Sequence, residues 1–214
     1  PEPVRIFALP LADTAELVGY GNVELGTGDL RDARLPEGLL EGVDTVFHCA
    51  SVFRPRWVQD LYRVNVEGTR RLLDAAIAAK VRRFVYVSSH AVAGTNNDPS
   101  QPMREGEPPR PFLNYGLSKL QAERLVQNAH EHGLIETVIA RPCWYYGPNQ
   151  PRSQTEFFRR VRRGRPPVFG SGGNLRSMSY IDNVVQGLLL ARDVEKAAGN
   201  TYWLTDRRAY SYIE

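Results

Sequence analysis

The hydrophobic positions of the chain form short apolar runs that alternate with longer stretches of mixed polarity. Runs rich in Val, Ile and aromatic residues and bounded by turn residues are typical of strands. We therefore expect strands at residues 4–9, 22–30, 45–50, 83–89 and 137–142. Because these runs are almost continuously apolar, they predict a parallel sheet that is buried on both faces.

Apolar residues recur at helical spacing in two long segments, residues 58–80 and 114–133, and Gly133 is placed to end the second one. The strand at 83–89 is separated from the second helix by residues 95–113, which contain five prolines and are predicted to form a loop. A loop of this length in a compact domain is usually functional. The alternation of strands and helices indicates a doubly wound α/β domain.

The pattern changes after about residue 143. The segments expected there are a loop at 144–154, a helix at 155–164, two short strands around glycines within 166–180, and a helix at 180–193. We therefore predict a dinucleotide-binding domain at residues 1–143. A small mixed lobe that binds substrate is expected at residues 144–214, interleaved with the sheet.

Charge narrows the possible partners. The chain has 27 basic and 24 acidic residues, which gives a net charge of +3, and its densest basic cluster is the arginine run within residues 157–165. Nucleic-acid surfaces interleave such charges with stacking aromatic residues or place them on a known module, and neither pattern is evident here. A solvated helix face is the favoured interpretation, and a nearby anionic ligand is the alternative. No nucleic-acid partner is expected.

Other classes of protein are excluded by what the sequence lacks. No apolar run reaches the roughly 18 residues of a membrane span, and the first ten residues do not resemble a signal peptide. Cys49 and Cys143 lie far apart in apolar contexts, which we interpret as buried, reduced thiols of a cytoplasmic protein, with a disulfide as the less favoured reading. Potential metal ligands do not recur at the spacing of a metal site, so none is expected.

The candidate chemistry lies in a tyrosine and a lysine four residues apart. Tyr115 and Lys119 share one face of the predicted helix at 114–133. A nearby ammonium favours the phenolate, so we expect Lys119 to bring the pKa of Tyr115 from about 10 toward neutrality. Ser88 and Ser89 end the strand at 83–89, and ligands bind at such carboxyl ends in parallel sheets. A hydroxyl there could donate a hydrogen bond to a substrate oxygen.

The segments VEGTRRLLDAAIAAKVRRFVYVSSHAVAG and NYGLSKLQAE resemble the central block of the extended short-chain dehydrogenase/reductases. This is the NAD-dependent epimerase/dehydratase and 3β-hydroxysteroid dehydrogenase group, and the resemblance covers nearly all of the chain. It implies a Rossmann-type domain, NAD or NADP as the cofactor, and hydride transfer at a hydroxyl-bearing carbon. It also implies that Tyr115 is the general acid/base, that Lys119 holds the ribose hydroxyls and tunes Tyr115, and that Ser89 positions the substrate oxygen.

The same resemblance assigns the surroundings of these residues. The residues implied to contact the cofactor are Asp29, Leu30, Ala50, Ser51, Asn65, Ser88, Tyr115, Lys119, Pro142 and Cys143. Of these, the resemblance places Asp29 at the adenine and gives Asn65 the role of propping the active-site strands. The residues implied to face the substrate are Ser89, His90, Trp144 and Arg176. His90 is not expected to be catalytic, because Tyr115 already supplies the acid/base chemistry.

The sequence departs from the family at its start. The first strand and its Gly-x-x-Gly-x-x-Gly turn, which cradles the cofactor pyrophosphate, are absent, and the chain opens at what resembles the second strand. We read it as an internal portion of a longer protein, or as one whose ends are not represented. Leu9 and Pro10 stand where an acid or an arginine usually selects the cofactor, so the choice between NAD and NADP stays open.

The substrate class rests on a few positions. Arg176 stands where nucleotide-sugar enzymes contact a diphosphate, and His90-Ala91 replaces the Asp-Glu pair of the dehydratases. We therefore expect an NAD(P)-dependent epimerase or dehydrogenase, acting on a nucleotide sugar and forming a homodimer through the helices at 58–80 and 114–133. The alternatives are a 3β-hydroxysteroid or dihydroflavonol-type dehydrogenase/reductase and a non-catalytic NAD(P)-binding regulatory protein.

Overall fold

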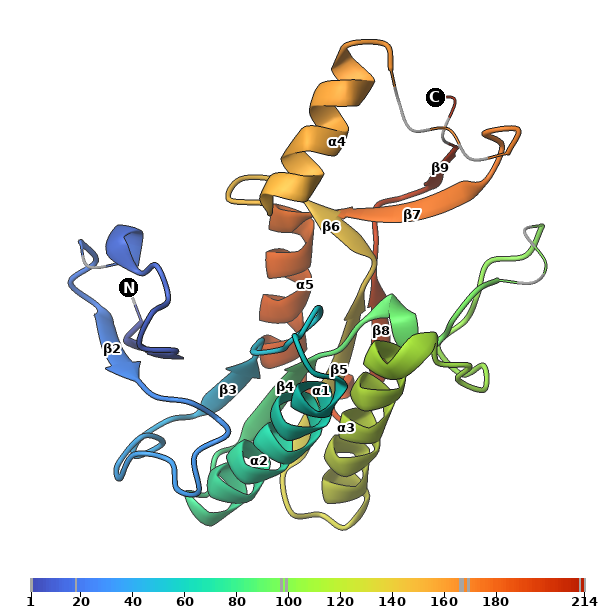
Figure 1. The fold of residues 1–214 in the computed structure, drawn as a ribbon. Coiled ribbons are helices and arrows are strands. Elements are labelled where there is room, and N and C mark those ends of the chain that lie inside the picture. Colours follow the sequence, from blue (N-terminus) through green and yellow to red (C-terminus); the bar gives the residue numbers. More distant parts are fainter. Residues whose placement is uncertain are drawn as a thin grey trace.

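The computed structural model describes residues 2–17, 19–96, 98, 100–165, 168, 170–211 and 213. Its centre is a four-stranded parallel sheet in the order β3-β4-β5-β8 (Figure 1). These strands are β3 (Thr45–His48), β4 (Arg83–Val87), β5 (Glu136–Pro142) and β8 (Thr201–Leu204). Three of the five predicted strands are thereby confirmed as neighbours in one parallel sheet.

The other two predicted strands are β1 (Val4–Ala8) and β2 (Val23–Thr27), which pair in parallel as a separate two-stranded sheet. Within the described residues, β1 is not hydrogen-bonded to β3, so the parallel arrangement is interrupted between them. The expected doubly wound, parallel-sheet α/β architecture of the Rossmann type is confirmed.

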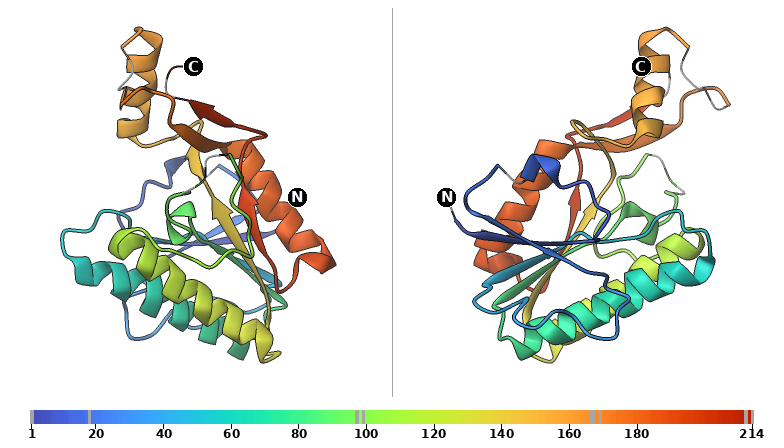
Figure 2. Two further views of the ribbon diagram at one scale, coloured as in Figure 1. Left: turned by 90° about the vertical axis from the view of Figure 1, so that its right-hand side faces the viewer. Right: turned by 60° about the vertical axis from the view of Figure 1, so that its left-hand side comes forward.

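Helices cover both faces of the central sheet (Figure 2). On one face lie α1 (Val58–Tyr62), a π-helical turn η2 (Arg63–Gly68), α2 (Thr69–Ala78) and α3 (Leu113–Glu131); on the other lies α5 (Ile181–Asp193). The long helix predicted at 58–80 is therefore one helical segment with a π turn in it. Such turns often occur at functional sites. Short 3₁₀ turns occur at η1 (Ala15–Leu17), η3 (His90–Val92) and η4 (Glu195–Ala197).

Strand alternation divides the core into two layers. Phe84 and Tyr86 of β4 are fully buried among apolar residues of α2 and α3, whereas Val85 between them packs with Ala191 of α5 on the opposite face. Successive residues of a strand point to opposite faces, so one apolar strand supplies both layers. The continuous apolar run at 83–89 therefore reflects burial on both sides.

The segment after residue 143 builds a small lobe from β6 (Trp144–Tyr146), α4 (Arg152–Arg162), β7 (Leu175–Tyr180) and β9 (Ala209–Ser211) (Figure 1). β6 and β7 are parallel, and β7 and β9 are antiparallel. β8 and α5 also follow residue 144, but β8 is a strand of the central sheet and α5 packs against that sheet. The lobe and the sheet domain are therefore interleaved in the sequence. The boundaries at 143 and 144 stay a prediction.

The lobe differs from the prediction in its first segment. The prediction of a loop at 144–154 is wrong at its start, because residues 144–146 pair with β7. The turn residues directly after Tyr146 favoured a loop in the prediction. In the structure the strand is stabilised by aromatic contacts with α4 and β7. Of the two strands expected within 166–180, β7 is found, and the first falls partly on Pro166, Pro167 and Phe169, outside the described residues.

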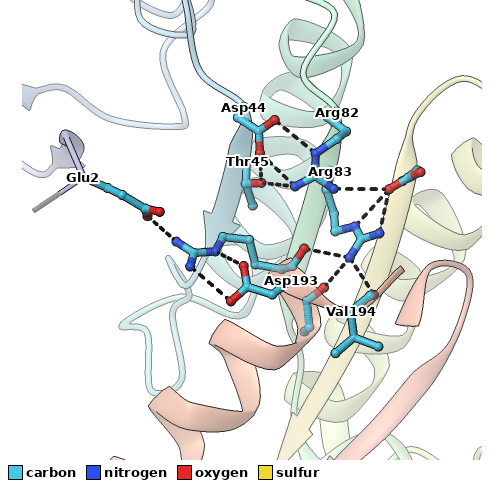
Figure 3. Close-up of polar contacts among 10 residues, drawn as sticks. Glu2, Asp44, Thr45, Arg82, Arg83, Asp193 and Val194 are labelled. Carbon is cyan, nitrogen blue, oxygen red and sulfur yellow. Dashed lines mark hydrogen bonds and ion pairs between the residues drawn. The ribbon is translucent and has the colours of Figure 1, made fainter. Parts of the chain in front are cut away.

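A network of charged residues closes the amino-terminal edge of the sheet (Figure 3). Arg83 is 1% exposed and donates to Glu136 of β5 at 3.0 and 2.8 Å. It also donates to three carbonyl oxygens at the end of α5, those of Ala191, Arg192 and Val194, at 3.0, 2.7 and 2.8 Å. The amide of Ala197 also donates to the Val194 carbonyl at 3.0 Å, whereas the carbonyls of Ala191 and Arg192 lie in the last turn of α5, where helical donors run out. Arg83 thus joins α5 to β4 and β5.

The described helices are too short or too polar for a membrane span.

Candidate active site

Three hydroxyl groups meet at the carboxyl ends of neighbouring strands. Ser51 follows β3, Ser89 follows β4, and Tyr115 lies in the first turn of α3. The side chains of Ser51 and Ser89 lie near enough to the phenol of Tyr115 for hydrogen bonding to lower its pKa. Parallel strands end at one edge of a sheet, which brings together residues that are far apart in the sequence.

The start of α3 is fixed against the turn that follows Ser89. The amide of Phe112 donates to the carbonyl of Ala91 at 2.8 Å. A side chain at Gly116 would collide with the same carbonyl, so this helix position needs glycine. Leu113 has a φ of 55°, a left-handed conformation that a leucine rarely adopts. The close approach of the two segments sets Tyr115 beside Ser89.

Ser89 and Ser88 use their polar atoms differently. Ser89 is 7% exposed and begins η3, where its Oγ accepts a hydrogen bond from the amide of Ala91 at 3.2 Å. The amide of Ser88 donates to the carbonyl of Ala140 at 2.7 Å, but its buried Oγ has no hydrogen-bond partner in the described structure. A buried hydroxyl without a partner is uncommon in a folded protein and is consistent with an unfilled ligand contact.

The pKa of Tyr115 differs from the expected direction. Burial raises this pKa above 10, and the hydrogen bonds from Ser51 and Ser89 only partly oppose the effect. The phenol ring also packs edge-on against Phe53, with ring centroids 4.8 Å apart. The expectation that Lys119 brings this pKa toward neutrality is therefore wrong for the protein alone, because burial of the phenol outweighs its stabilising contacts.

Lys119 lies deeper in the site than Tyr115. It is 1% exposed, and its Nζ donates to the carbonyl of Val87 at 2.8 Å and lies 4.3 Å from the ring centre of Tyr86. Burial lowers the pKa of Lys119 to about 7, against an opposing effect of the negative charge of Glu123. The ammonium is thus buried at the end of β4, directed at a main-chain carbonyl and an aromatic face.

Asn65 joins the loop after β3 to α3. Its Nδ2 donates to the carbonyl of Val52 and to Ser118 Oγ, both at 3.0 Å. Its Oδ1 accepts from the amide of Val52 at 2.8 Å and from Ser51 Oγ at 3.2 Å. Asn65 is fully buried in the π turn; three of its contacts hold the loop that carries Ser51, and the fourth ties that loop to Ser118 of α3. This geometry suits the propping role expected of Asn65, which stays a prediction.

His48 supports the same turn from beneath. Thr69 Oγ1 donates to the carbonyl of Asn65 at 2.7 Å, so it accepts from His48 Nε2, which lies 2.8 Å away. Complete burial lowers the pKa of His48 to about 3. His48 is therefore a neutral core residue with a satisfied hydrogen bond, as its position within a strand predicts.

Three predicted substrate residues meet where the lobe approaches the sheet. The guanidinium of Arg176 in β7 stacks over the ring of Trp144 in β6, at 4.9 Å from its centre. His90 is close enough to Arg176 for that charge to lower its pKa, although restricted hydration is the larger cause and a hydrogen bond to the Pro142 carbonyl opposes both. Cation, aromatic ring and imidazole therefore line one side of the site.

The residues expected at the adenine end lie in the turn after β2. Asp29 is held by Arg31, with its Oδ2 2.6 Å from Arg31 Nη2, and hydrogen bonding from Arg31 lowers the pKa of Asp29. Leu30 is 6% exposed and its side chain packs in the core against Gly68. Any contact of Leu30 with a cofactor would therefore come from its main chain.

The cysteines are only partly as predicted. Both are free, but Cys49 is exposed and Cys143 is half-buried, so the expectation that both thiols are buried is wrong. Cys49 lies just beyond β3 and Cys143 just beyond Pro142, where the chain leaves the sheet at the site edge. Ala50 is likewise exposed there, and Pro142 is buried at the end of β5. The amide of Cys143 donates to the carbonyl of Leu204 at 3.1 Å.

These residues fit the ribose and nicotinamide end of a dinucleotide. Among the described residues, Lys119 Nζ donates one hydrogen bond, which leaves two donors for ligand hydroxyls, and the Ser88 hydroxyl is unpaired. A glycine-rich phosphate turn does not occur in this sequence. In the described part of the chain, no group of three or more His, Cys, Asp or Glu residues is placed to hold a metal ion.

Two charged residues near the site escaped the sequence reasoning. Glu123 is 3% exposed and Arg141 is 7% exposed, and they form an ion pair behind Lys119. The available signal was spacing, because Glu123 follows Lys119 by four residues and so shares its helix face.

Comparison with known proteins gives a consistent result. The profile of the NAD dependent epimerase/dehydratase family matches residues 8–204. The chain is 35% identical over 188 residues to a 4-hydroxy-2-methyl-3-oxo-4-farnesyl-3,4-dihydroquinoline-1-oxide ketoreductase of Stigmatella aurantiaca, covering 85% of this chain and 54% of the relative. It is 32% identical over 211 residues to a UDP-glucose 4-epimerase of Vibrio cholerae, covering 94% and 62%. The chain thus spans little more than half the length of these relatives.

A solved structure, MoeE5 in complex with UDP-glucuronic acid and NAD, superimposes with a TM-score of 0.80 at 32% identity. The match covers 99% of this chain and 71% of that protein. The similarity therefore extends over the whole described fold, the site included.

Proposed function

Because this chain belongs to the NAD-dependent epimerase/dehydratase family, we propose that it supplies the catalytic centre of an NAD(P)-dependent enzyme. In this proposal the enzyme is an epimerase or dehydrogenase that acts on a hydroxyl-bearing carbon of a nucleotide sugar. The observation that carries the proposal is the meeting of Ser51, Ser89 and Tyr115 above the buried Lys119, at the carboxyl ends of β3 and β4.

Each group has a role that its position supports. Bound NAD(P) would accept a hydride from the substrate carbon and return it. Tyr115 takes the proton of the substrate hydroxyl and gives it back, and the hydroxyls of Ser51 and Ser89 stabilise the charge on its oxygen. The free donors of Lys119 bind ribose hydroxyls, and a cation placed there favours the phenolate of Tyr115.

The raised pKa of Tyr115 determines its protonation state before the cofactor and substrate bind. The phenol is kept protonated in the protein alone, so it is poised as an acid until other groups lower its pKa. In the proposed cycle, the ligand-filled site supplies that change. Activity is therefore expected to need the bound cofactor, whose positive nicotinamide ring favours the phenolate.

A nucleotide sugar is proposed because the site offers a cation and an aromatic ring together. Arg176 is exposed and its guanidinium lies over the ring of Trp144; a guanidinium is planar and suited to bidentate contact with phosphate oxygens. The similarity to a UDP-glucose 4-epimerase and to a protein solved with UDP-glucuronic acid and NAD supports the same class.

The test is to titrate UDP into the protein and into Arg176→Ala by calorimetry. Loss of a charge-assisted contact should weaken UDP binding roughly ten- to hundredfold, or about 1.5–3 kcal/mol. Arg82→Ala is the control, since Arg82 pairs with Asp44 at the opposite end of β4. Unchanged binding in Arg176→Ala would place the phosphates elsewhere, with the arginines of α4 next to test. If the unsubstituted protein ignores millimolar UDP, the nucleotide-sugar proposal fails.

A second candidate is a ketoreductase or hydroxysteroid-type dehydrogenase with an apolar substrate. It is favoured by the 35% identity to the farnesyl-dihydroquinoline ketoreductase and by the aromatic surface of Trp144, Phe157 and Phe158 in the lobe. This candidate predicts turnover without UDP binding.

The remaining alternative, a non-catalytic NAD(P)-binding regulatory protein, predicts cofactor binding without turnover. A cytoplasmic location stays a prediction for all three candidates.

A further inference from the structure

The face of α3 that carries Tyr115 and Lys119 continues to a third polar residue. Glu123 follows Lys119 by four positions, as Lys119 follows Tyr115, so the three side chains lie in one row along the helix. Tyr115 is at the open end of the row, whereas Lys119 and Glu123 are 1% and 3% exposed. The row therefore runs from the proposed reaction centre into the protein interior.

Glu123 is held at the inner end by Arg141 of β5. Arg141 Nε lies 2.9 Å from Glu123 Oε1, and Nη2 lies 2.7 Å from Oε2, so both carboxylate oxygens are engaged. The guanidinium of Arg141 also lies 5.6 Å from the ring centre of Trp203 in β8. A bidentate pair of this kind fixes the direction of the carboxylate.

Stability alone gives little reason for this pair. Both side chains are withdrawn from water, and the cost of desolvating two charges commonly cancels their attraction. Apolar residues of similar volume often replace such a pair without loss of stability. A fixed charge next to a catalytic group, in contrast, cannot be replaced by an apolar side chain.

The surroundings of Lys119 contain few groups that can act on its charge. His48 of β3 is neutral, since burial lowers the pKa of its imidazole. Cys49 is exposed as a residue, but its sulfur is poorly hydrated, which raises the pKa of the thiol and keeps it neutral. The Tyr86 ring of β4 offers its face, and burial also keeps its phenol neutral. Glu123 is thus the acidic residue whose charge most favours the ammonium of Lys119.

We propose that Glu123, held by Arg141, is a positioning residue of the site, whose carboxylate keeps the buried Lys119 in its ammonium form beneath Tyr115. The inference rests on the proposed function, because it assigns a purpose to the charge on Lys119. Glu123 touches neither substrate nor cofactor in this scheme and acts only through the lysine.

The experiment measures the titration of Lys119 directly. The chain has three lysines, and Lys80 and Lys196 are both exposed, so ¹³C labelling of lysine gives one buried signal and two internal references. In Glu123→Gln we expect the pKa of Lys119 to fall by about one unit or more, with the references unmoved. Glu131→Gln removes an exposed carboxylate from the end of the same helix and should leave all three signals unchanged.

A double variant separates charge from folding. Glu123→Leu with Arg141→Met replaces the pair by apolar residues, which should preserve the urea midpoint even if Glu123→Gln folds poorly. The proposal expects the pKa of Lys119 to fall in this variant, and the alkaline limb of the turnover profile of the holoenzyme to change with it. An unchanged lysine pKa in the folded double variant would overturn the inference. The titration needs no substrate, so a failure of the proposed function would appear separately, as absent turnover in the unsubstituted enzyme.

Discussion

Two adjacent arginines at the start of β4 allow a matched test of what burial adds to an ion pair. Arg82 and Arg83 each bind a carboxylate at 2.8 Å, but the Arg82 side chain is 45% exposed and that of Arg83 is 1% exposed. Arg83 additionally binds three carbonyl oxygens at the end of α5 (Figure 3). The same substitution to methionine at each position removes the charge and keeps most of the aliphatic volume.

The expected loss of unfolding free energy differs between the two variants because each leaves different polar groups without their arginine. Arg83→Met removes the donor that the Ala191 and Arg192 carbonyls share, and Ala191 is buried; breaking such a buried interaction typically costs about 3–5 kcal/mol. Glu136 is 45% exposed and can be rehydrated, so it adds little to this cost. Arg82→Met loses surface pairs with Asp44 and, at 3.5 Å, with Glu136, and an exposed pair is typically worth about 0–1 kcal/mol.

The assay is urea unfolding of both variants beside the unsubstituted protein, with the slope compared as well as the midpoint. We expect a large loss of unfolding free energy for Arg83→Met and a small one for Arg82→Met. If Arg83→Met costs about 1 kcal/mol or less, or no more than Arg82→Met, then Arg83 does not join α5 to the sheet as argued.

Three further predictions concern catalysis, pH and assembly. Tyr115→Phe should lower turnover about 10²–10⁴-fold with little change in cofactor binding, and full activity would refute the assigned acid/base role. The pKa of His48 is about 3 in the folded protein and 6.5 in an ordinary histidine. As the pH falls from 6.5 toward 3, the imidazole therefore binds a proton in the unfolded chain but not in the folded protein. Stability should therefore fall by up to about 1.4 kcal/mol per pH unit, and urea midpoints at pH 6.5 and pH 5 should show His48→Gln to be less acid-sensitive. The helical segment at 58–78 and α3 are predicted to pair two subunits, and light scattering at micromolar concentration should give a dimer mass rather than a monomer mass.

Much of the site could be read from sequence because its signals are local. The spacing of Tyr115 and Lys119 places them on one helix face in any α-helix, whatever packs around it. Ser89 lies at the end of an apolar run, and such runs become parallel strands whose ends converge. Helix and strand periodicity also gave all five predicted strands and both long helices to within a few residues.

Other features depend on residues that the sequence does not connect. Arg83 meets carbonyls more than 100 residues away, and its charge on a buried strand has no local explanation. Trp144–Tyr146 becomes a strand only because β7 supplies a partner and α4 supplies aromatic contacts. Pairing between distant segments produces no periodic pattern along the chain. The turn residues that follow Tyr146 therefore led to the prediction of a loop at 144–154.

The sequence by itself therefore determined which groups are present and which helix face or strand end carries them, since these follow from backbone periodicity. Only the tertiary structure decided the protonation of those groups. Burial raises the pKa of Tyr115 and lowers that of Lys119, whose ammonium the charge of Glu123 favours. The physical reason is that desolvation depends on everything packed around a group, and that packing is set by contacts between distant parts of the chain.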